Sequence, residues 1–253
     1  MPLLPAGSLV VELAATRLAG RTGDLLVVGP SLGTSVEALW GECASLLADE
    51  FEVIGWDLPG HGRSRPASAA FTVADLASAV RELVPDDDRN VWYAGISVGG
   101  AVGLQLALEP GPFGAVAALA TAPKIGDAQA WQDRAELVRR AGTGVMVSGS
   151  AARWFAPGFT DRHPDIAGAL LTSLIDADPG SYAHTCDALA ELDLRGREAK
   201  LPLLVAIGKH DPVVTVDDDC VVLDGCGHLP AAEDPGAVAT LLREFFTTQR
   251  GVR

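Results

Sequence analysis

The chain has 253 residues and a formal net charge of −14 at neutral pH, and 48% of its residues are hydrophobic. This length accommodates one large domain with a sizeable core. The acidic balance argues against nucleic acid and anionic membranes as partners, because both are bound by positively charged surfaces.

The first residues lack the basic region of a secretory signal, and no uninterrupted apolar run has the length of a membrane span. The four cysteines are scattered without a C-x-x-C pair: Cys43, Cys186, Cys220 and Cys226. They predict reduced thiols rather than a disulfide set or a zinc site. We therefore expect a cytoplasmic protein that needs no metal. The sequence carries no prediction of an oligomeric state.

Apolar runs and helical patterns alternate along the chain. In chain order, we expect a hairpin over residues 8–19, strands over 25–28, 52–56, 91–94 and 115–119, helices over 36–48 and from Thr72 to before Pro85, strands over 203–208 and 221–223, and a closing helix over 236–247. This alternation predicts an α/β fold with a mostly parallel, doubly wound sheet and helices on both faces.

Residues 95–100, Gly-Ile-Ser-Val-Gly-Gly, lie between a short apolar run and a helical stretch. In this context G-x-S-x-G forms a nucleophile elbow, a turn so sharp that only small residues fit two positions before and after the serine. The turn would place the Ser97 hydroxyl in a pocket and aim the backbone N–H of Val98 at an anion formed there. Ser97 is therefore the candidate nucleophile, and an ordinary Gly-Ser turn is the alternative.

Residues 127–194 contain no convincing strand and are instead typical of several short helices. The expected breaks between these helices are residues 142–144, 157–158, 163–164 and 179–180. A helical insertion between two sheet strands, next to the nucleophile, predicts a cap over the site. We expect a core of residues 1–126 and 195–253, with the cap inserted after the sixth strand.

An acid and then a histidine should follow the elbow serine along the chain. Asp211 follows the apolar strand at 203–208, and its alternative role is that of a turn-forming Asp-Pro residue. His228 lies on a glycine-rich loop after the run at 221–223, and it alone of the five histidines combines this order with a loop after a strand. His61 lies in a Pro-Gly turn, which favours a structural role.

With elbow, acid, histidine and cap in place, the chain resembles the α/β-hydrolase family over essentially its whole length. Three places resemble one subfamily, the 3-oxoadipate enol-lactonases of aromatic catabolism. Residues 31–34, Ser-Leu-Gly-Thr, occupy the position where most relatives carry a His-Gly oxyanion motif. Residues 121–134 and 182–194 are similar to that subfamily's cap. The resemblance implies a serine hydrolase that opens the lactone ring of 3-oxoadipate enol-lactone without a cofactor.

The resemblance also implies roles for individual residues. Ser97 would attack the lactone carbonyl, His228 would take the serine proton, and Asp211 would fix the imidazole tautomer. The backbone N–H groups of Leu32 and Val98 would hold the oxyanion. Relatives usually fit a whole helix between the acid and histidine strands, whereas this chain has room for little more than a turn. The run at residues 217–219, Asp-Asp-Asp, is a conceivable substitute acid, although a solvated turn is its simpler interpretation.

The lactone carries an acetate side chain, so a cation is expected in the pocket of this otherwise acidic protein. Residues 121–160 carry more basic than acidic side chains. Arg134 is our candidate, because a guanidinium matches a carboxylate, and Lys124 is a second one. For each, the alternative is a solvated surface charge. Trp131 precedes Arg134 by one helical turn, so we expect it on the same face as a wall of the pocket.

Other functions remain open at this point. Within enzymes, the alternative is an esterase or carbon–carbon bond hydrolase acting on another small acid. From a different class, the fold could serve as a ligand receptor or a silent scaffold. Haloalkane dehalogenases and epoxide hydrolases are disfavoured, because their nucleophile is an aspartate where this chain has Ser97.

Overall fold

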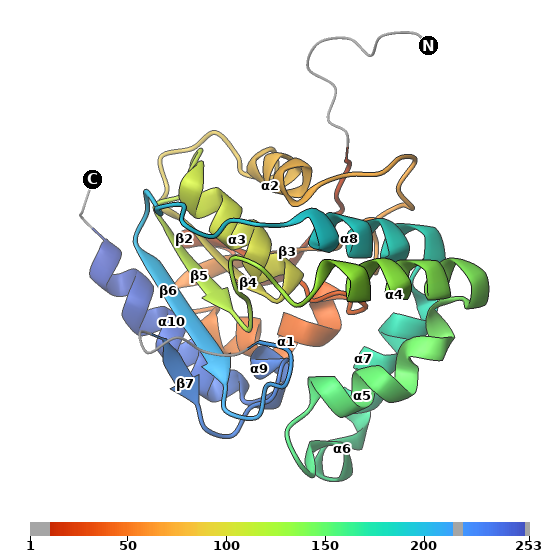
Figure 1. Ribbon diagram of the computed structural model, residues 1–253. Helices are drawn as coiled ribbons and strands as arrows, with labels where there is room; N and C mark the ends of the chain where they lie inside the picture. Colours follow the sequence, from red (N-terminus) through yellow and green to blue (C-terminus); the bar gives the residue numbers. More distant parts are fainter. Residues whose placement is uncertain (1–10, 215–219, 251–253) are drawn as a thin grey trace, which may run out of the picture.

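A seven-stranded sheet forms the centre of the protein, whose computed structural model describes residues 11–214 and 220–250 (Figure 1). The strands lie in the order β1-β3-β2-β4-β5-β6-β7. β1 is antiparallel to β3, and every other neighbouring pair is parallel. The strands are β1 Ala15–Ala19, β2 Asp24–Gly29, β3 Phe51–Trp56, β4 Val91–Ile96, β5 Ala115–Leu119, β6 Leu203–Gly208 and β7 Val221–Leu223. The predicted α/β fold with a mostly parallel sheet is confirmed.

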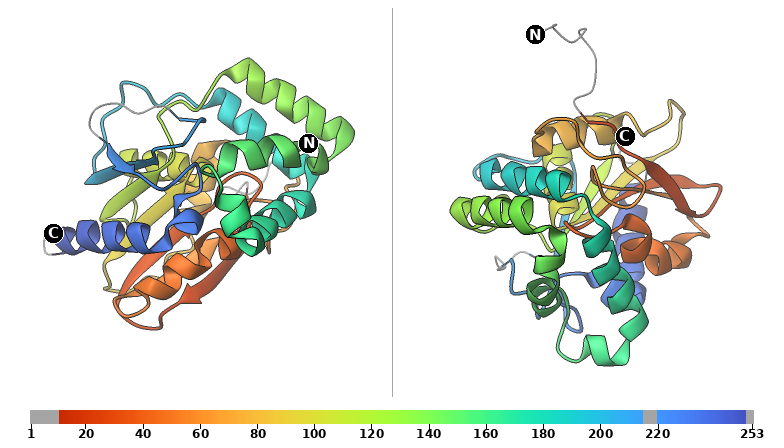
Figure 2. Two further views of the ribbon diagram at one scale, coloured as in Figure 1. Left: turned by 90° about the horizontal axis from the view of Figure 1, so that it is seen from below. Right: turned by 90° about the vertical axis from the view of Figure 1, so that its right-hand side faces the viewer.

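Helices cover both faces of the sheet, as a parallel sheet requires. α1 (Val36–Leu47) and α10 (Pro235–Gln249) lie on one face, and α2 (Val73–Arg81) and α3 (Val98–Leu108) lie on the other (Figures 1 and 2). Every residue of β4 and β5 is buried, which explains why these strands are apolar without alternation. The short helix α9 (Pro230–Glu233) precedes α10.

Local sequence signals set the helix ends. Thr72 begins α2 with a capping box, in which its side chain accepts from the backbone of Asp75 and the Asp75 side chain accepts in return. The helix start expected at Thr72 is therefore confirmed. Ser35 caps α1 in a similar way by accepting from Ala38 N.

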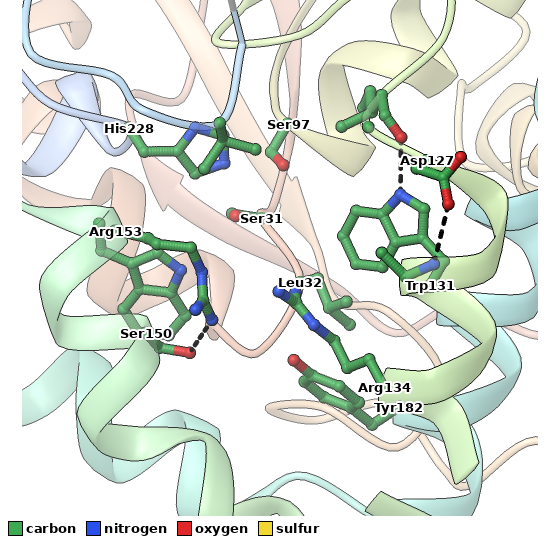
Figure 3. A pocket seen from close by; sticks show the side chains of 15 residues that line it. Ser31, Leu32, Ser97, Asp127, Trp131, Arg134, Ser150, Arg153, Tyr182 and His228 are labelled. Carbon is green, nitrogen blue, oxygen red and sulfur yellow. Dashed lines mark hydrogen bonds between the residues drawn. The ribbon is translucent and has the colours of Figure 1, made fainter. Parts of the chain in front are cut away.

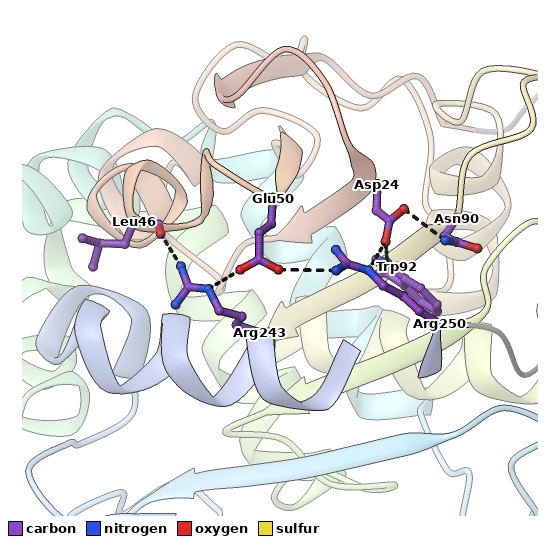
Figure 4. A network of polar contacts seen from close by, with 7 residues as sticks. All are labelled: Asp24, Leu46, Glu50, Asn90, Trp92, Arg243 and Arg250. Carbon is purple, nitrogen blue, oxygen red and sulfur yellow. Dashed lines mark hydrogen bonds and ion pairs between the residues drawn. The ribbon is translucent and has the colours of Figure 1, made fainter. Parts of the chain in front are cut away.

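The C-terminal helix is fastened to the sheet by two arginines (Figure 4). Arg243 Nε lies 2.6 Å from Glu50 Oε1, and Arg250 Nε lies 2.8 Å from Asp24 Oδ2. Asp24 also accepts from Asn90 at 3.0 Å and from the Trp92 indole at 3.1 Å. One carboxylate at the start of β2 thus joins β4 and the end of α10.

The segment between β5 and β6 is helical throughout. Its elements are α4 Ala128–Ala141, η1 Thr143–Met146, α5 Val147–Trp154, α6 Phe159–Arg162, α7 Pro164–Asp176 and α8 Pro179–Glu191. These helices lie together to one side of the sheet, with α4 alongside α8 (Figures 1 and 2). Pro179 and Gly180 were expected at a break but form the first turn of α8, where proline is tolerated because its missing N–H is not needed.

The expected opening hairpin needs correction. Residues 8–10 lie outside the described part of the chain, and residues 11–19 contain the single strand β1. β1 pairs with β3 rather than with a sequence neighbour, because the turn through Gly20 and Gly23 runs against the backbone at the start of β3. The helical insertion therefore follows β5. It was expected after the sixth strand, because the expected hairpin contributed two strands and the structure has one. Across the described residues, no helix combines the length and apolar character needed to cross a membrane.

Candidate active site

Ser97 lies on a tight turn between β4 and α3, with a backbone φ of 57° and ψ of −115°. A positive φ is strained for any residue with a Cβ, and such strain is tolerated only where the surroundings enforce it. The turn is held by three bonds, Ser97 N to Leu119 O at 2.9 Å, Gly99 N to Pro30 O at 2.9 Å and the Tyr93 hydroxyl to Gly99 O at 2.8 Å. A Cβ at Gly95 would overlap the backbone of Gly99, so the predicted need for small residues in the elbow is met in this structure.

A cavity of about 160 Å³ lies at the carboxyl edge of the sheet, where the parallel strands end (Figure 3). Ser97 and His228 both line it, and each is almost fully buried. Leu32, Trp131 and Arg134 line the same cavity. The structure thus brings together side chains from the β2 loop, the elbow, the first insertion helix and the loop after β7.

Asp211 and His228 meet as the sequence predicted. The imidazole Nδ1 lies 2.8 Å from Asp211 Oδ2, the geometry of an N–H donating to a carboxylate, and the Asp211 side chain is fully buried. The second carboxylate oxygen accepts from Val213 N at 2.7 Å and Val214 N at 3.3 Å. Asp211 is thereby fixed on the β6 loop and directed at the imidazole. The substitute acids considered at residues 217–219 lie outside the described residues.

The Ser97 hydroxyl and the imidazole share the cavity but are not hydrogen-bonded to each other in this structure (Figure 3). Bonds between catalytic groups are often long before substrate binds and tighten in the reacting complex. The arrangement provides a serine hydroxyl, an imidazole and a buried carboxylate, the three side-chain types that acyl transfer uses.

The backbone around the two oxyanion candidates is ordered by local bonds. Val98 is the first residue of α3, so its N–H has no acceptor within the helix. Leu32 lies in the Ser-Leu-Gly-Thr turn, where the Thr34 hydroxyl donates to Ser31 O at 2.9 Å and Thr34 N donates to the same oxygen at 3.1 Å. Gly33 has a φ of 88°, which glycine adopts without strain. The role of these two N–H groups stays a prediction.

The candidate carboxylate ligands separate into two places. Trp131 and Arg134 lie on one face of α4, as their spacing predicted, and the Arg134 guanidinium stands 4.6 Å from the Trp131 ring centre. The Trp131 indole donates to Ile125 O at 2.6 Å, which fixes the ring at the cavity wall. Lys124 does not line the cavity and instead pairs with Asp193 at 3.7 Å.

Arg153 is a cavity residue that the sequence reasoning did not single out. It lies on α5, and burial lowers the pKa of its guanidinium, with the positive charge of Arg134 adding to the effect. The local excess of basic residues was the available signal, since Arg153 is one of the basic residues between 121 and 160. Tyr182 of α8 also lines the cavity, and burial raises its pKa to about 12.

Glu233 holds the loop that carries His228. Its carboxylate accepts from Gly227 N at 2.8 Å and Leu229 N at 3.2 Å, on either side of the histidine. The other oxygen accepts from Ala156 N at 2.6 Å, just after α5. Burial raises the pKa of Glu233, and the three N–H donors oppose that shift in part. In the described residues, no group of three or more His, Cys, Asp or Glu side chains is arranged to hold a metal.

A doubly wound, mostly parallel sheet with a serine on a strained elbow at its carboxyl edge defines the class of α/β-fold hydrolases. The chain belongs to the alpha/beta hydrolase family, whose model matches residues 25–241. The family match and the fold therefore agree, and the chain is a hydrolase.

Relatives with known names narrow the comparison. The 3-oxoadipate enol-lactonase 2 of Acinetobacter baylyi is 38% identical over 197 residues, which cover 76% of this chain and 73% of the relative. The 3-oxoadipate enol-lactonase 1 of the same organism is 29% identical over 223 residues, covering 82% of each chain. The crystal structure of the enol-lactonase from Burkholderia xenovorans LB400 has a TM-score of 0.85 at 27% identity, covering 93% of this chain and 96% of that one.

Proposed function

We propose that this protein is a serine hydrolase that opens the lactone ring of 3-oxoadipate enol-lactone to give 3-oxoadipate. The observation that carries the proposal is the strained Ser97 at a cavity that is also lined by His228, whose imidazole is hydrogen-bonded to the buried Asp211. The likeness to two enol-lactonases by sequence and to a third by structure supports the choice of substrate. The reaction consumes one water and requires no cofactor.

The proposed reaction begins with attack of the Ser97 oxygen on the lactone carbonyl, as His228 takes the hydroxyl proton. Asp211 holds the imidazole Nδ1–H and stabilises the imidazolium. The N–H groups of Val98 and Leu32 stabilise the oxyanion, an effect worth roughly 3 kcal/mol per donor in comparable sites. The ring C–O bond then breaks, and the enolate, still tethered to the acyl group on Ser97, takes the proton from His228 and becomes a ketone. Water, activated by His228, cleaves the acyl-serine ester.

Arg134 is the proposed ligand of the substrate's acetate group. Its guanidinium projects into the cavity from α4 (Figure 3), and no acidic side chain among the described residues forms an ion pair with it. The insertion at residues 127–194 would act as the cap that supplies this cation and covers the site. A small anionic lactone is the proposed binding partner.

Labelling with a fluorophosphonate probe tests the nucleophile. We expect the wild type and Ser31→Ala to react and Ser97→Ala not to react, because Ser31 also lines the cavity but does not lie on the elbow. Labelling that persists in Ser97→Ala would show that another residue is the nucleophile.

Ultraviolet assay of freshly generated enol-lactone tests the substrate. We expect rapid loss of absorbance with the wild type and none above background with Ser97→Ala. Rapid cleavage of neutral aryl esters by an enzyme that ignores the enol-lactone would favour the esterase alternative. Absence of both activities and of probe labelling would favour the binding-protein alternative.

A further inference from the structure

Two arginines on different helices enter the candidate active-site cavity. Arg134 comes from α4 and Arg153 from α5, and both are partly buried. Their guanidinium groups extend toward one another from opposite sides of the cavity, below Ser31 and Ser97 in the view of Figure 3. The two cations therefore share one small space next to the nucleophile.

Neither guanidinium is neutralised within the described part of the chain. Among the described residues, Arg153 has a single side-chain hydrogen bond, to the Ser150 hydroxyl at 3.4 Å, and Arg134 stacks on Trp131. Of the acidic side chains that the structure describes, Asp127 is the one that lines the cavity, and it caps α4 by accepting from Gln129 N at 2.9 Å and Ala130 N at 3.2 Å.

Other partly buried arginines of this protein do have carboxylate partners. Arg89 pairs with the buried Glu52 at 2.6 Å, and Arg243 pairs with Glu50 at 2.6 Å. Like charges held together away from water are unfavourable unless an opposite charge joins them. An anion placed between Arg134 and Arg153 would relieve this repulsion and accept hydrogen bonds from both guanidinium groups, whose planar donors match a carboxylate.

We propose that Arg153 is a second carboxylate-binding residue, and that Arg134 and Arg153 together grip one carboxylate of the ligand between α4 and α5. This inference deepens the proposed function and rests on it for the identity of the substrate. It makes recognition of the negative charge depend on two helices of the insertion rather than on one.

Paired lactone substrates separate charge recognition from catalysis. The anionic enol-lactone is compared with 5-methyl-2(3H)-furanone, which has an enol-lactone ring and a methyl group in place of the acetate. For Arg153→Gln, we expect kcat/KM to fall about tenfold to hundredfold on the anionic lactone, mainly through KM, and to change less than about threefold on the neutral one. Arg153→Lys should recover part of the lost kcat/KM on the anionic lactone, because lysine restores the positive charge without the two-pronged hydrogen bonding of a guanidinium.

Arg140→Gln is the matched control. Arg140 lies on α4, is 67% exposed on its side chain and pairs only with Glu136 among the described residues, so this variant removes one positive charge outside the cavity. An equal loss of kcat/KM on the anionic lactone in Arg140→Gln and Arg153→Gln would show that the effect comes from the net charge of the protein rather than from a contact in the cavity. Equal losses on the two lactones would assign Arg153 a structural role. Either result would overturn the proposal, as would an Arg153→Gln enzyme with wild-type kcat/KM.

A binding measurement keeps the inference testable if the enol-lactone is not the substrate. Adipate, a stable dicarboxylate, is titrated into Ser97→Ala while tryptophan fluorescence is followed, because Trp131 and Trp154 both line the cavity. We expect saturable binding that is lost in the Arg153→Gln and Arg134→Gln backgrounds and kept in the Arg140→Gln background. Binding that survives Arg153→Gln unchanged would refute the two-arginine site even if the lactone is hydrolysed.

Discussion

The backbone N–H of His228 donates to the carbonyl oxygen of Trp154 at 2.9 Å, so the loop carrying the imidazole is bonded directly to the end of α5. Gly227 makes this approach possible, because a Cβ there would come within 2.7 Å of Ala156 N. The carboxylate of Glu233 completes the junction by accepting from both segments. The candidate base and the helical insertion therefore form one bonded unit.

Removing the Glu233 carboxylate should weaken that junction. We expect Glu233→Ala to lower the free energy of unfolding by on the order of 3 kcal/mol, because three backbone N–H groups lose their acceptor. We also expect slower fluorophosphonate labelling of Ser97 and an altered pH profile of that labelling, because the loop that carries His228 loses the acceptor of its Gly227 and Leu229 N–H groups.

The neighbouring Asp234 provides the control for this experiment. Asp234 caps α10 by accepting from Ala237 N at 2.9 Å. Asp234→Ala should cost about 1 kcal/mol of stability, and it should leave the pH profile of labelling unchanged. Identical profiles for Glu233→Ala and the wild type would show that Glu233 does not position the histidine.

Replacing a glycine of the elbow by alanine should lower the free energy of unfolding, whereas the same replacement in the helix α1 should raise it. Gly99→Ala would place a Cβ 2.6 Å from Pro30 O, so we expect a loss of at least about 2 kcal/mol in unfolding free energy and loss of probe labelling. Gly41 in α1 has no atom within 4 Å of such a Cβ. Gly41→Ala should therefore raise stability by roughly 0.5–1 kcal/mol. Urea denaturation of both variants measures the difference, and equal effects would contradict the elbow packing described here.

His61 should make the fold sensitive to mild acid. Burial lowers its pKa to about 4, and its Nδ1 lies 2.9 Å from Pro59 O. The unfolded chain binds a proton on this residue below its ordinary pKa of about 6.5, whereas the folded chain does not until about pH 4, so stability falls as the pH is lowered through that window. His61→Asn keeps an N–H for the Pro59 carbonyl but does not titrate. We expect its unfolding free energy to fall less between about pH 7 and about pH 4.5, and parallel curves for both proteins would refute this role.

Asp24 should contribute to stability through the α10 contacts of Figure 4. Asp24→Ala leaves the Trp92 indole, Asn90 and Arg250 without their shared acceptor, so we expect a loss of about 2 kcal/mol. Asp49→Ala, at a nearby exposed position, should stay within about 0.5 kcal/mol of the wild type. Thermal or urea unfolding distinguishes them, and a neutral Asp24→Ala would show that water replaces these contacts.

Local sequence predicted what depends on local physics. The β4–Ser97–α3 unit could be anticipated because glycine at fixed positions, an apolar strand and a helix occur together within a short segment. The capping box at Thr72 likewise lies within four residues. Asp211 and His228 could be paired because parallel strands place their carboxyl ends at one edge of the sheet.

Features that depend on contacts between residues far apart in the sequence could not be predicted from the sequence. Arg153 looked like any surface cation, since its place in the cavity with Arg134 depends on the path of the chain between α4 and α5. Lys124 was the second candidate ligand, yet it lies beside Asp193 and does not line the cavity. The pairing of β1 with β3 was missed because edge-strand partners are set by the path of the following turn rather than by the strand's own residues.

The fastening of α5 to the histidine loop restricts how a ligand can enter and leave. A rigid movement of the whole helical insertion would displace the imidazole of His228 from Asp211 in every catalytic cycle. The turn at Gly142–Gly144 separates α4 from α5, Gly142 has a φ of 77°, and neither glycine has a neighbouring atom where a Cβ would stand. Any movement that opens the cavity without displacing the imidazole must therefore leave α5 in place, and a carboxylate held by Arg134 and Arg153 would join α4 to that fixed helix.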